Sequence, residues 1–323
     1  MIRITNKYSV TSNLPKLYKH LDELKDFQRY KSHPIMIHFM LTNQCNLACE
    51  NCCFSAVRND GKNMPLEEAK EIAKQFRLLG TKAIEITGAG DFTVYRDINE
   101  FIRYIKEIGY SVGGNTNGIL AKKITEWDKF DWVRLSMNTL DFYDESKYPL
   151  DYIRSFNPSP KISGCYVWNS QGEKNIKRVI DFANKEKITV RVVPNCIQSK
   201  EGIKKEMDYI IKLLDKYEDN NYVFASDHNM DLGERRNNNC YIHHIKPCVF
   251  TDGWVYSCPS SELAVENEIT MKPEFKICKG TDVCEYYTKN FEVKQHNCSY
   301  CKYKSQNEFL EDLLMETEFN DFA

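Results

Sequence analysis

The sequence predicts an α/β fold in which a partial (β/α)6 TIM-like barrel is followed by a small cysteine-rich domain. From residue 34 onward, short apolar and β-branched runs alternate with segments of helical periodicity, which is typical of βα units around a parallel sheet. Six such runs are too few for a closed eight-stranded barrel but enough for a partial one. From about residue 237 helices become rare while cysteines and aromatic residues become frequent, which indicates a second domain.

The barrel segment is expected to contain six strands separated by helices. The expected strands are Ile35–Leu41, Lys82–Thr87, Tyr110–Asn115, Trp132–Met137, Ile162–Trp168 and Ile188–Val193. The helix Pro65–Leu79 has clear end signals, because proline suits a first turn, Glu67 and Glu68 complement the positive helix end, and Gly80 ends the helix. Helices are also expected at Asp97–Ile108, Lys174–Lys187 and Glu201–Asp219.

Both ends of the chain add elements to this barrel. Leu14, Leu17, Leu21 and Leu24 keep a three-to-four spacing, which predicts one short helix packed on the outside of the sheet. The run Thr251–Trp254 predicts a hairpin turn between two strands. The expected organisation is therefore an N-terminal helical extension (1–33), the barrel (34–230) and a C-terminal domain with a terminal helix (231–323).

Charge and hydropathy exclude some classes of partner. Lys and Arg number 44 against 46 Asp and Glu, giving a formal charge of −2, so no global positive field exists to hold a nucleic-acid polymer. No apolar run reaches the roughly 18–20 residues that span a bilayer, and the start of the chain lacks the apolar region of a signal peptide. We therefore expect a cytoplasmic protein without a membrane partner.

The cysteines are numerous and clustered. Of 13 cysteines, four lie between residues 45 and 53 and seven between residues 240 and 301. Cysteines in a reducing compartment cannot be assumed to form disulfides, so clustered ones are interpreted first as metal ligands. Cys165 and Cys196 stand alone in the sequence and are expected to be buried strand residues.

The first cluster, Cys45, Cys49 and Cys52, directly follows the first expected strand, so its thiols lie at the catalytic end of such a sheet. A [4Fe–4S] cluster has four irons, and three thiolates leave one iron open for a small molecule. Cysteines separated by three and then two residues on this loop resemble the radical S-adenosylmethionine (radical SAM) superfamily.

The resemblance implies both cofactors and catalysis. In that superfamily the amino and carboxylate groups of S-adenosylmethionine chelate the open iron. An electron from the cluster breaks the C5′–S bond, and the 5′-deoxyadenosyl radical removes a hydrogen atom from the substrate. The resemblance therefore assigns Cys45, Cys49 and Cys52 as catalytic cluster ligands, served by a reducing partner such as flavodoxin or ferredoxin.

Two alternatives concern the first cluster. Cys53 could replace Cys52 as the third ligand, although we interpret it as a bystander. The superfamily usually has an aromatic residue before the third cysteine, whereas Asn51 stands here and Phe54 follows two positions beyond Cys52. The other alternative is a zinc site, whose fourth ligand would have to be His38 reaching back along the strand.

A glycine-rich segment follows the second expected strand. Gly88, Ala89, Gly90 and Asp91 resemble the superfamily motif that meets the methionine end of S-adenosylmethionine. Glycines allow close backbone approach, and an acidic end can accept from an ammonium group. Ala89 replaces a glycine and Asp91 replaces the usual glutamate, so the contact is expected to involve backbone carbonyls more than Asp91.

Three further positions resemble cofactor contacts of the superfamily. Asn117 follows the third strand and Ser136 ends the fourth, where relatives bind the ribose and carboxylate of the cofactor. An Asn-Gly pair is also a common simple turn. Arg191, near the end of the sixth strand, could pair with the cofactor carboxylate or equally with a helix carboxylate.

The second cluster resembles the auxiliary region of the SPASM and twitch subfamilies. The resemblance implies that Cys240, Cys258, Cys298 and Cys301 bind a further [4Fe–4S] cluster, with Gly253 placed before the second ligand. Four thiolates would saturate that cluster, which favours an electron relay. No cysteine follows Cys301, so a single auxiliary cluster of the twitch type is expected.

Alternatives remain open in this region too. Cys248 competes with Cys240 for the first ligand position, although it falls where a strand residue would pack. Cys278 and Cys284 are structural or support a second cluster, and a zinc ribbon would share the four-thiolate geometry. The polar side chains between the two regions are interpreted as a solvated linker without a role: Asp227, His228, Glu234, Arg235, Arg236, His243 and His244.

The leading function is a radical SAM enzyme acting on a small metabolite such as a sugar, nucleoside or amino-acid derivative. Peptide maturation is the alternative, disfavoured because only about 33 residues precede the first strand, too few for a leader-binding domain of typical size. The alternative from a different functional class is a non-catalytic zinc-binding or regulatory protein.

Overall fold

A single large sheet organises the molecule. The computed structural model describes residues 14–226, 236–258, 273–296, 298, 301 and 303–316. Ten strands form one sheet in the order β11-β10-β9-β1-β2-β3-β4-β5-β6-β7, and β12 pairs with β8 in a two-stranded sheet. The strands are β1 (Met36–Phe39), β2 (Ala83–Ile86), β3 (Ser111–Thr116), β4 (Trp132–Ser136), β5 (Lys161–Val167), β6 (Thr189–Val193), β7 (Val223–Ala225), β8 (Asn239–Cys240), β9 (Cys248–Val249), β10 (Trp254–Tyr256), β11 (Lys276–Lys279) and β12 (Lys294–Gln295).

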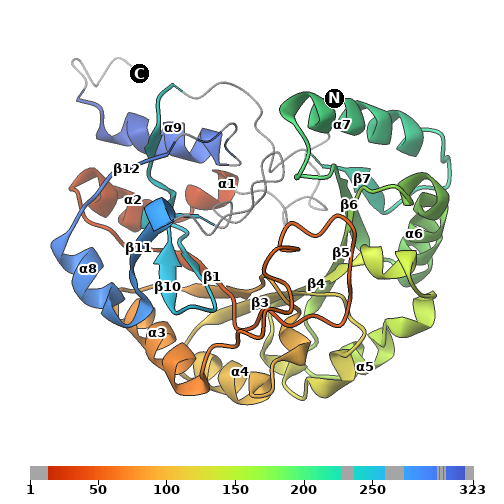
Figure 1. Cartoon of the computed structure of the whole chain (residues 1–323), viewed down its shortest axis with the longest axis horizontal. Helices are drawn as coiled ribbons and strands as arrows, with labels where there is room; N and C mark the ends of the chain where they lie inside the picture. Colours follow the sequence, from red (N-terminus) through yellow and green to blue (C-terminus); the bar gives the residue numbers. More distant parts are fainter. Residues whose placement is uncertain are drawn as a thin grey trace.

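Helices follow most of the barrel strands. The α-helices are α1 (Leu14–Leu17), α2 (Leu21–Gln28), α3 (Leu66–Leu78), α4 (Ile98–Glu107), α5 (Leu150–Arg154), α6 (Gly172–Glu186), α7 (Lys200–Leu214), α8 (Val283–Lys289) and α9 (Lys304–Leu314). Short 3₁₀ helices are η2 (Phe92–Val94), η3 (Ala121–Lys123), η4 (Trp127–Lys129), η5 (Met137–Asp141), η6 (Glu145–Lys147), η7 (Ile242–His244), η9 (Pro273–Phe275) and η10 (Gly280–Asp282). Figure 1 shows the sheet curving inside a ring of helices α3 to α6.

The predicted partial barrel is confirmed. All six expected strands form, and β1 to β6 pair in parallel with their sequence neighbours. A seventh parallel strand, β7, was not predicted and extends the sheet beyond β6. Parallel pairing brings the carboxyl ends of these strands to one edge, which is where the connecting loops of such a sheet carry function.

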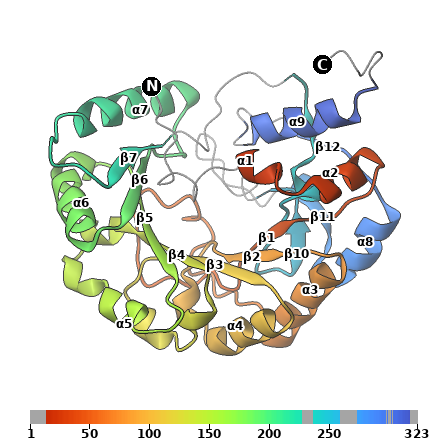
Figure 2. The same cartoon turned by 180° about the vertical axis from the view of Figure 1, so that it is seen from behind.

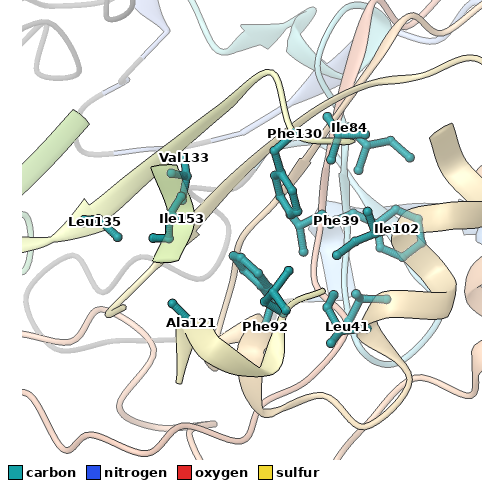
Figure 3. Close-up of a cluster of buried hydrophobic side chains, with 14 of the residues drawn as sticks. Phe39, Leu41, Ile84, Phe92, Ile102, Ala121, Phe130, Val133, Leu135 and Ile153 are labelled. Atoms are coloured by element: carbon teal, nitrogen blue, oxygen red, sulfur yellow. The ribbon is translucent and has the colours of Figure 1, made fainter. Parts of the chain in front are cut away.

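An apolar core fills the space between the sheet and its outer helices. Side chains of β1, β2 and β4 alternate, and the outward members pack against α4 and the loop helices (Figure 3). Phe39, Phe92 and Phe130 are among the buried residues of this cluster, and the rings of Phe92 and Phe130 stack with centroids 5.8 Å apart. The other side of the strands therefore faces the inside of the curved sheet, here called the concave face.

The N-terminal segment differs from the expectation. Two short helices, α1 and α2, replace the single helix, because the chain turns at Tyr18–His20 before the second helix begins. Leu24 and Phe27 of α2 pack with Tyr241 and Leu310 rather than on the outside of the sheet. The leucine spacing therefore identified a helical segment correctly but placed it wrongly, since the apolar partner comes from the C-terminal region.

The C-terminal region continues the sheet. Strand β9 pairs in parallel with β1, with His38 opposite Cys248, and the predicted hairpin joins β9 to β10 in antiparallel pairing. Gly253 occupies the turn with φ +74°, a conformation that suits glycine. The expected domain boundary at residues 230–231 lies outside the described residues. Figure 2 shows β10 and β11 beside β1, with α8 and α9 beyond them.

No helix in the described part of the chain is long and apolar enough to span a bilayer.

Candidate functional site

The first cysteine cluster lies on the long loop between β1 and α3. Cys45, Cys49 and Cys52 are all half-buried. Their thiols are close enough for the charge of Cys52 to act on both Cys45 and Cys49. The three predicted ligands therefore lie on one loop at the carboxyl end of the first strand.

The donor set fits an iron–sulfur cluster. Burial raises the pKa of the Cys49 thiol to about 12, and the charges of Cys52 and Cys45 act in the same direction. Burial likewise raises the pKa of Cys45. A thiolate is the form that binds metal, so these thiols need a nearby positive centre such as cluster iron in order to ionise.

A mononuclear zinc site fits less well. In the described ranges no three histidine, cysteine or carboxylate side chains converge on one metal position, whereas zinc needs four donors within about 2.3 Å of one point. A [4Fe–4S] cluster binds each thiolate through a different iron, so its ligands lie further apart. His38, the proposed fourth zinc ligand, has Nε2 3.9 Å from Glu85 Oε2 on the concave face.

The cysteine loop is held against the glycine-rich segment after β2. The amide of Gly90 donates to the Thr42 carbonyl at 3.0 Å, and the amide of Asp91 donates to the Gln44 carbonyl at 2.9 Å. A Cβ on Gly90 would lie 2.0 Å from the Gln44 carbonyl oxygen. Gly88 has φ +139°, and a Cβ there would lie 2.4 Å from Met40 Cγ. Only glycine permits this approach of the two loops.

The Asp91 carboxylate is occupied within the protein. Oδ1 accepts from the Thr93 amide at 3.0 Å and from Thr93 Oγ1 at 2.6 Å. Both oxygens accept from Thr116 Oγ1, and Oδ2 accepts from the Asn117 amide at 2.6 Å. Asp91 is buried at 4% exposure. It therefore ties the end of β2 to the end of β3, and the predicted acceptance of a cofactor ammonium has to compete with these donors.

Asn117 lies beside the first cysteine. Its Nδ2 donates to Asn46 Oδ1 at 2.7 Å and lies 3.9 Å from Cys45 Sγ. Its Oδ1 accepts from the Ile119 amide at 3.1 Å, as expected of a turn residue. Asn117 is therefore a turn residue that lies beside the cysteine loop, and its contact with the cofactor stays a prediction.

The far side of the loop is fixed to β5. Asn51 Nδ2 donates to the Val167 carbonyl at 3.2 Å, and Ser170 Oγ donates to Glu50 Oε2 at 2.7 Å. Within the loop, Asn59 Oδ1 accepts from the Cys45 amide at 2.8 Å. Asn51 and Asn59 were not predicted as contributors, although asparagine is a frequent partner of loop amides. The cysteine loop consequently spans the sheet edge from β2 to β5.

Ser136 of β4 and Arg191 of β6 both lie on the concave face, with β5 between their strands. Ser136 is opposite Cys165 in the register of β4 and β5, and Cys165 is opposite Arg191 in the register of β5 and β6. Arg191 Nε donates to Cys165 Sγ at 3.4 Å. Cys165, expected to be a buried strand residue, is half-buried. The Ser136 carbonyl accepts from the Tyr148 hydroxyl at 2.6 Å, which fixes the end of β4.

The second cysteine set gathers in an apolar cluster of the C-terminal region. Cys240 and Cys258 are buried together with Tyr303, and Cys301 packs against them. Asn307 Nδ2 donates to Cys301 Sγ at 3.4 Å. Cys298 is half-buried and is flanked by residues outside the described ranges, so its part in the set stays a prediction.

The other cysteines of this region differ in their surroundings. Cys248 is fully buried in β9 and packs with Met40, Phe250 and Tyr256. Its charge acts on Tyr303, as do those of Cys258 and Cys301, so the preference for Cys240 stays a prediction. Cys278 belongs to the main apolar core, and Cys284 packs against that core. These positions favour a structural role for both.

The prediction of a solvated linker is wrong for two of its residues. His243 and His244 are buried with 0% and 1% exposure. Their Nε2 atoms lie 2.9 and 3.1 Å from the Glu292 carbonyl oxygen, so both carry the proton on Nε2. The ring of Phe291 stacks on His244 at 4.3 Å. Aromatic neighbours distant in sequence therefore bury the pair, whereas residues 227–235 of that run lie outside the described part of the chain.

A polar chain on the concave face was missed by the sequence analysis. Asn115 Nδ2 donates to Glu85 Oε1 at 2.7 Å, and Arg134 Nη1 donates to Asn115 Oδ1 at 3.3 Å. These residues come from β3, β2 and β4 and lie below the cysteine loop along the strands. The available signal was a charged residue within each of two strands otherwise predicted to be buried.

Comparison with known proteins agrees with this geometry. The profile of the Radical SAM superfamily matches residues 39–197, which include the cysteine loop and the strands that carry it. A probable GTP 3′,8-cyclase of Pyrococcus horikoshii is 33% identical over 125 residues, 38% of this chain and 38% of that protein. The mycofactocin maturase MftC of Mycolicibacterium smegmatis is 28% identical over 120 residues, 36% of this chain and 30% of that protein. The chain thus matches about a third of the length of these curated relatives.

Two solved structures share the fold over most of this chain. SuiB of Streptococcus suis, bound to the precursor peptide SuiA, covers 84% of this chain and 69% of its own, with a TM-score of 0.55 and 20% identity. The enzyme anSMEcpe with bound AdoMet and the Cp18Cys peptide covers 90% of this chain and 86% of its own, with a TM-score of 0.53 and 12% identity. At these identities the likeness concerns the fold alone.

Proposed function

Because the chain belongs to the radical SAM superfamily, we propose that it is an enzyme that binds a [4Fe–4S] cluster through Cys45, Cys49 and Cys52 and cleaves S-adenosylmethionine there. The observation that carries the proposal is the set of three half-buried thiols on the loop after β1, tied across the carboxyl end of a parallel sheet. The mutual influence of their charges supports a shared cluster, and three thiolates on four irons would leave one iron open.

The chain's own residues hold and orient the two cofactors in this proposal. When bound, they supply an electron and a 5′-deoxyadenosyl radical that removes hydrogen from a substrate. The Gly88–Gly90 backbone would hold the methionine end, since the missing side chains allow close approach. Asn117, Ser136 and Arg191 are proposed to bind the remaining polar groups, and Asp91 supports the site by fixing Asn117.

The C-terminal region is proposed to hold a second [4Fe–4S] cluster as an electron relay. Cys240, Cys258, Cys298 and Cys301 are its proposed ligands, within a domain at 231–323 that follows a barrel at 34–230. The gathering of Cys240, Cys258 and Cys301 around Tyr303 supports this assignment. A reducing partner such as flavodoxin or ferredoxin is proposed to deliver the electron.

The proposed substrate is a small metabolite such as a sugar, nucleoside or amino-acid derivative. Its support is the charged chain Glu85–Asn115–Arg134 on the concave face, which suits a compact polar ligand. Peptide maturation is the second candidate, since SuiB and anSMEcpe share the fold and are described with bound peptides.

The test is anaerobic reconstitution with iron and sulfide, reduction with dithionite in the presence of S-adenosylmethionine, and chromatography for 5′-deoxyadenosine. Wild-type protein is expected to form the product, and Cys49→Ala is expected to form none. Cys53→Ala is the matched control and is expected to retain the activity. Equal 5′-deoxyadenosine formation by wild type and Cys49→Ala would refute the enzyme assignment. Loss of this activity in Cys53→Ala, with its retention in Cys52→Ala, would identify Cys53 rather than Cys52 as the third ligand.

A further inference from the structure

The concave face below the cysteine loop carries half-buried cations around one half-buried carboxylate. Glu85 Oε1 is already bonded to Asn115, which in turn accepts from Arg134. Burial opposes the ionisation of Glu85, but His38, Lys246 and Arg134 outweigh it and lower its pKa to about 2. Glu85 is therefore an anion shared by several cationic neighbours.

The cations of this face repel one another. Burial, followed by the charge of Arg191, lowers the pKa of Arg134 to about 10. Burial also lowers the pKa of Lys246, which Glu85 raises and Arg134 lowers further. In the described ranges neither Arg134 nor Lys246 forms an ion pair within 4.0 Å. Buried charge is costly unless it is paired, so this region favours an added anion.

An unused hydrogen-bond donor lies next to Arg134. Ser163 of β5 is directly opposite Arg134 in the parallel register, so both side chains are on the concave face. Ser163 is 8% exposed, and its hydroxyl has no hydrogen-bond partner among the described residues. Buried hydroxyls almost always have a partner. A guanidinium and a hydroxyl without a partner, side by side, provide the hydrogen-bond donors that bind an oxyanion.

The depth of this pair separates it from the proposed cofactor contacts. Arg134 precedes Ser136 by two residues in β4, which corresponds to about 7 Å along the strand. An oxyanion held at Arg134 therefore lies below the level at which Ser136 and the cysteine loop would meet S-adenosylmethionine.

We propose that Arg134 and Ser163 form the oxyanion subsite of the substrate, which is therefore a small molecule with a carboxylate or phosphate group. The proposal rests on the proposed function, because it assigns the rest of that molecule to the space between this subsite and the cysteine loop. Arg134 binds and orients the substrate, and its stacking on Trp132, 5.0 Å from ring to guanidinium, holds the guanidinium in place.

The test measures anion binding to the full-length, cluster-loaded protein saturated with S-adenosylmethionine. Inorganic phosphate and acetate are titrated separately at constant ionic strength, and the shift in melting temperature gives each affinity. Stabilisation by phosphate alone indicates a phosphorylated substrate, and stabilisation by acetate alone indicates a carboxylate. Stabilisation by neither overturns the proposal.

Single substitutions test whether the anion binds at Arg134 and Ser163. Arg134→Gln is expected to weaken anion binding at least about 30-fold, because it removes one partner of a buried charge pair. Ser163→Ala, a small change without loss of charge, is expected to weaken it about fivefold and keeps the test valid if Arg134→Gln does not fold. The control is Arg96→Gln, since Arg96 is 91% exposed, and it is expected to change nothing.

Two results count against the subsite. Unchanged anion affinity in Arg134→Gln and Ser163→Ala would refute it. A loss of S-adenosylmethionine affinity in Arg134→Gln as large as its loss of anion affinity would assign Arg134 to the cofactor instead. Formation of 5′-deoxyadenosine by the wild type is measured independently, so failure of the proposed function is distinguished from failure of the subsite.

Discussion

The two cysteine sets are held by different means. The first lies on a half-exposed loop whose backbone and asparagine side chains are hydrogen-bonded to the ends of β2, β3 and β5. The second lies in an apolar cluster around Tyr303 and Ile242. Cys45, Cys49 and Cys52 are half-buried, whereas Cys240 and Cys258 of the second set are buried. This difference agrees with the open catalytic cluster and the electron relay proposed above.

The sharpest test of this comparison is the iron content and activity of matched cysteine variants. Wild-type protein reconstituted without oxygen is expected to bind about eight irons per chain. Cys49→Ser and Cys258→Ser are each expected to lose about four, but only Cys49→Ser loses all 5′-deoxyadenosine formation. Loss of that product in Cys258→Ser at full retention of the first cluster would contradict the separation of roles.

The substitution Gly90→Ala tests the contact between the cysteine loop and the glycine-rich segment after β2. The added Cβ would clash with the Gln44 carbonyl, so the free energy of unfolding is expected to fall by more than about 3 kcal/mol. Urea denaturation checks this. Gly202→Ala is the control, because Gly202, like Gly90, lacks a positive φ, and the atom nearest its Cβ position is the flexible end of the Gln198 side chain. A similar loss in both variants would show that the contact with the Gln44 carbonyl is not responsible.

Of the two regions that hold the cysteine sets, the C-terminal one is expected to lose stability as the pH falls. Burial lowers the pKa of His244 to about 4 from its usual 6.5, so the folded state favours the neutral ring. The stability contributed by the neutral ring is present above pH 6.5 and is lost as pH falls toward 4, by about 3 kcal/mol in total. Denaturation of wild type and His244→Phe across this range checks the sign. An equal slope in both proteins would remove His244 as the cause.

The smallest expected effect concerns Asn307. Its Oδ1 accepts from the Tyr241 amide at 2.7 Å and its Nδ2 donates to Cys301 Sγ. Asn307→Ala leaves a buried amide unpaired and is expected to cost about 1–2 kcal/mol in urea denaturation. The exposed Asn290 provides the control variant Asn290→Ala. Equal stability of the two variants would mean that apolar packing alone holds the second set.

The sequence predicted those parts of the fold that depend on local patterns. The six barrel strands and helix α3 have apolar alternation and end signals such as Gly80, which takes φ +90° in the structure. Strands β7 and β9 span three and two residues, too short for any periodicity to be recognised. Their existence depends on pairing with β6 and β1, which is a long-range property.

The same division applies to the candidate site. Ligand spacing predicted Cys45, Cys49 and Cys52, because metal chemistry imposes a characteristic spacing on ligands within one loop. Glu85 and Arg134 were not recognised, since alternating polar residues of a strand look the same whether they face water or the inside of a curved sheet. His243 was misplaced for a related reason: residue type alone does not reveal which distant aromatic rings will cover it.

The parallel pairing of β9 with β1 has a practical consequence for anyone dividing this chain. The amides of Ile35, His38 and Met40 donate to carbonyls of Ile245, Pro247 and Val249. A fragment that stopped at residue 226 would keep the cysteine loop but leave this side of β1 as an uncovered edge, open to association with other copies. Isolated barrel fragments should therefore precipitate, and deletion experiments on the C-terminal half would report misfolding before they reported electron transfer.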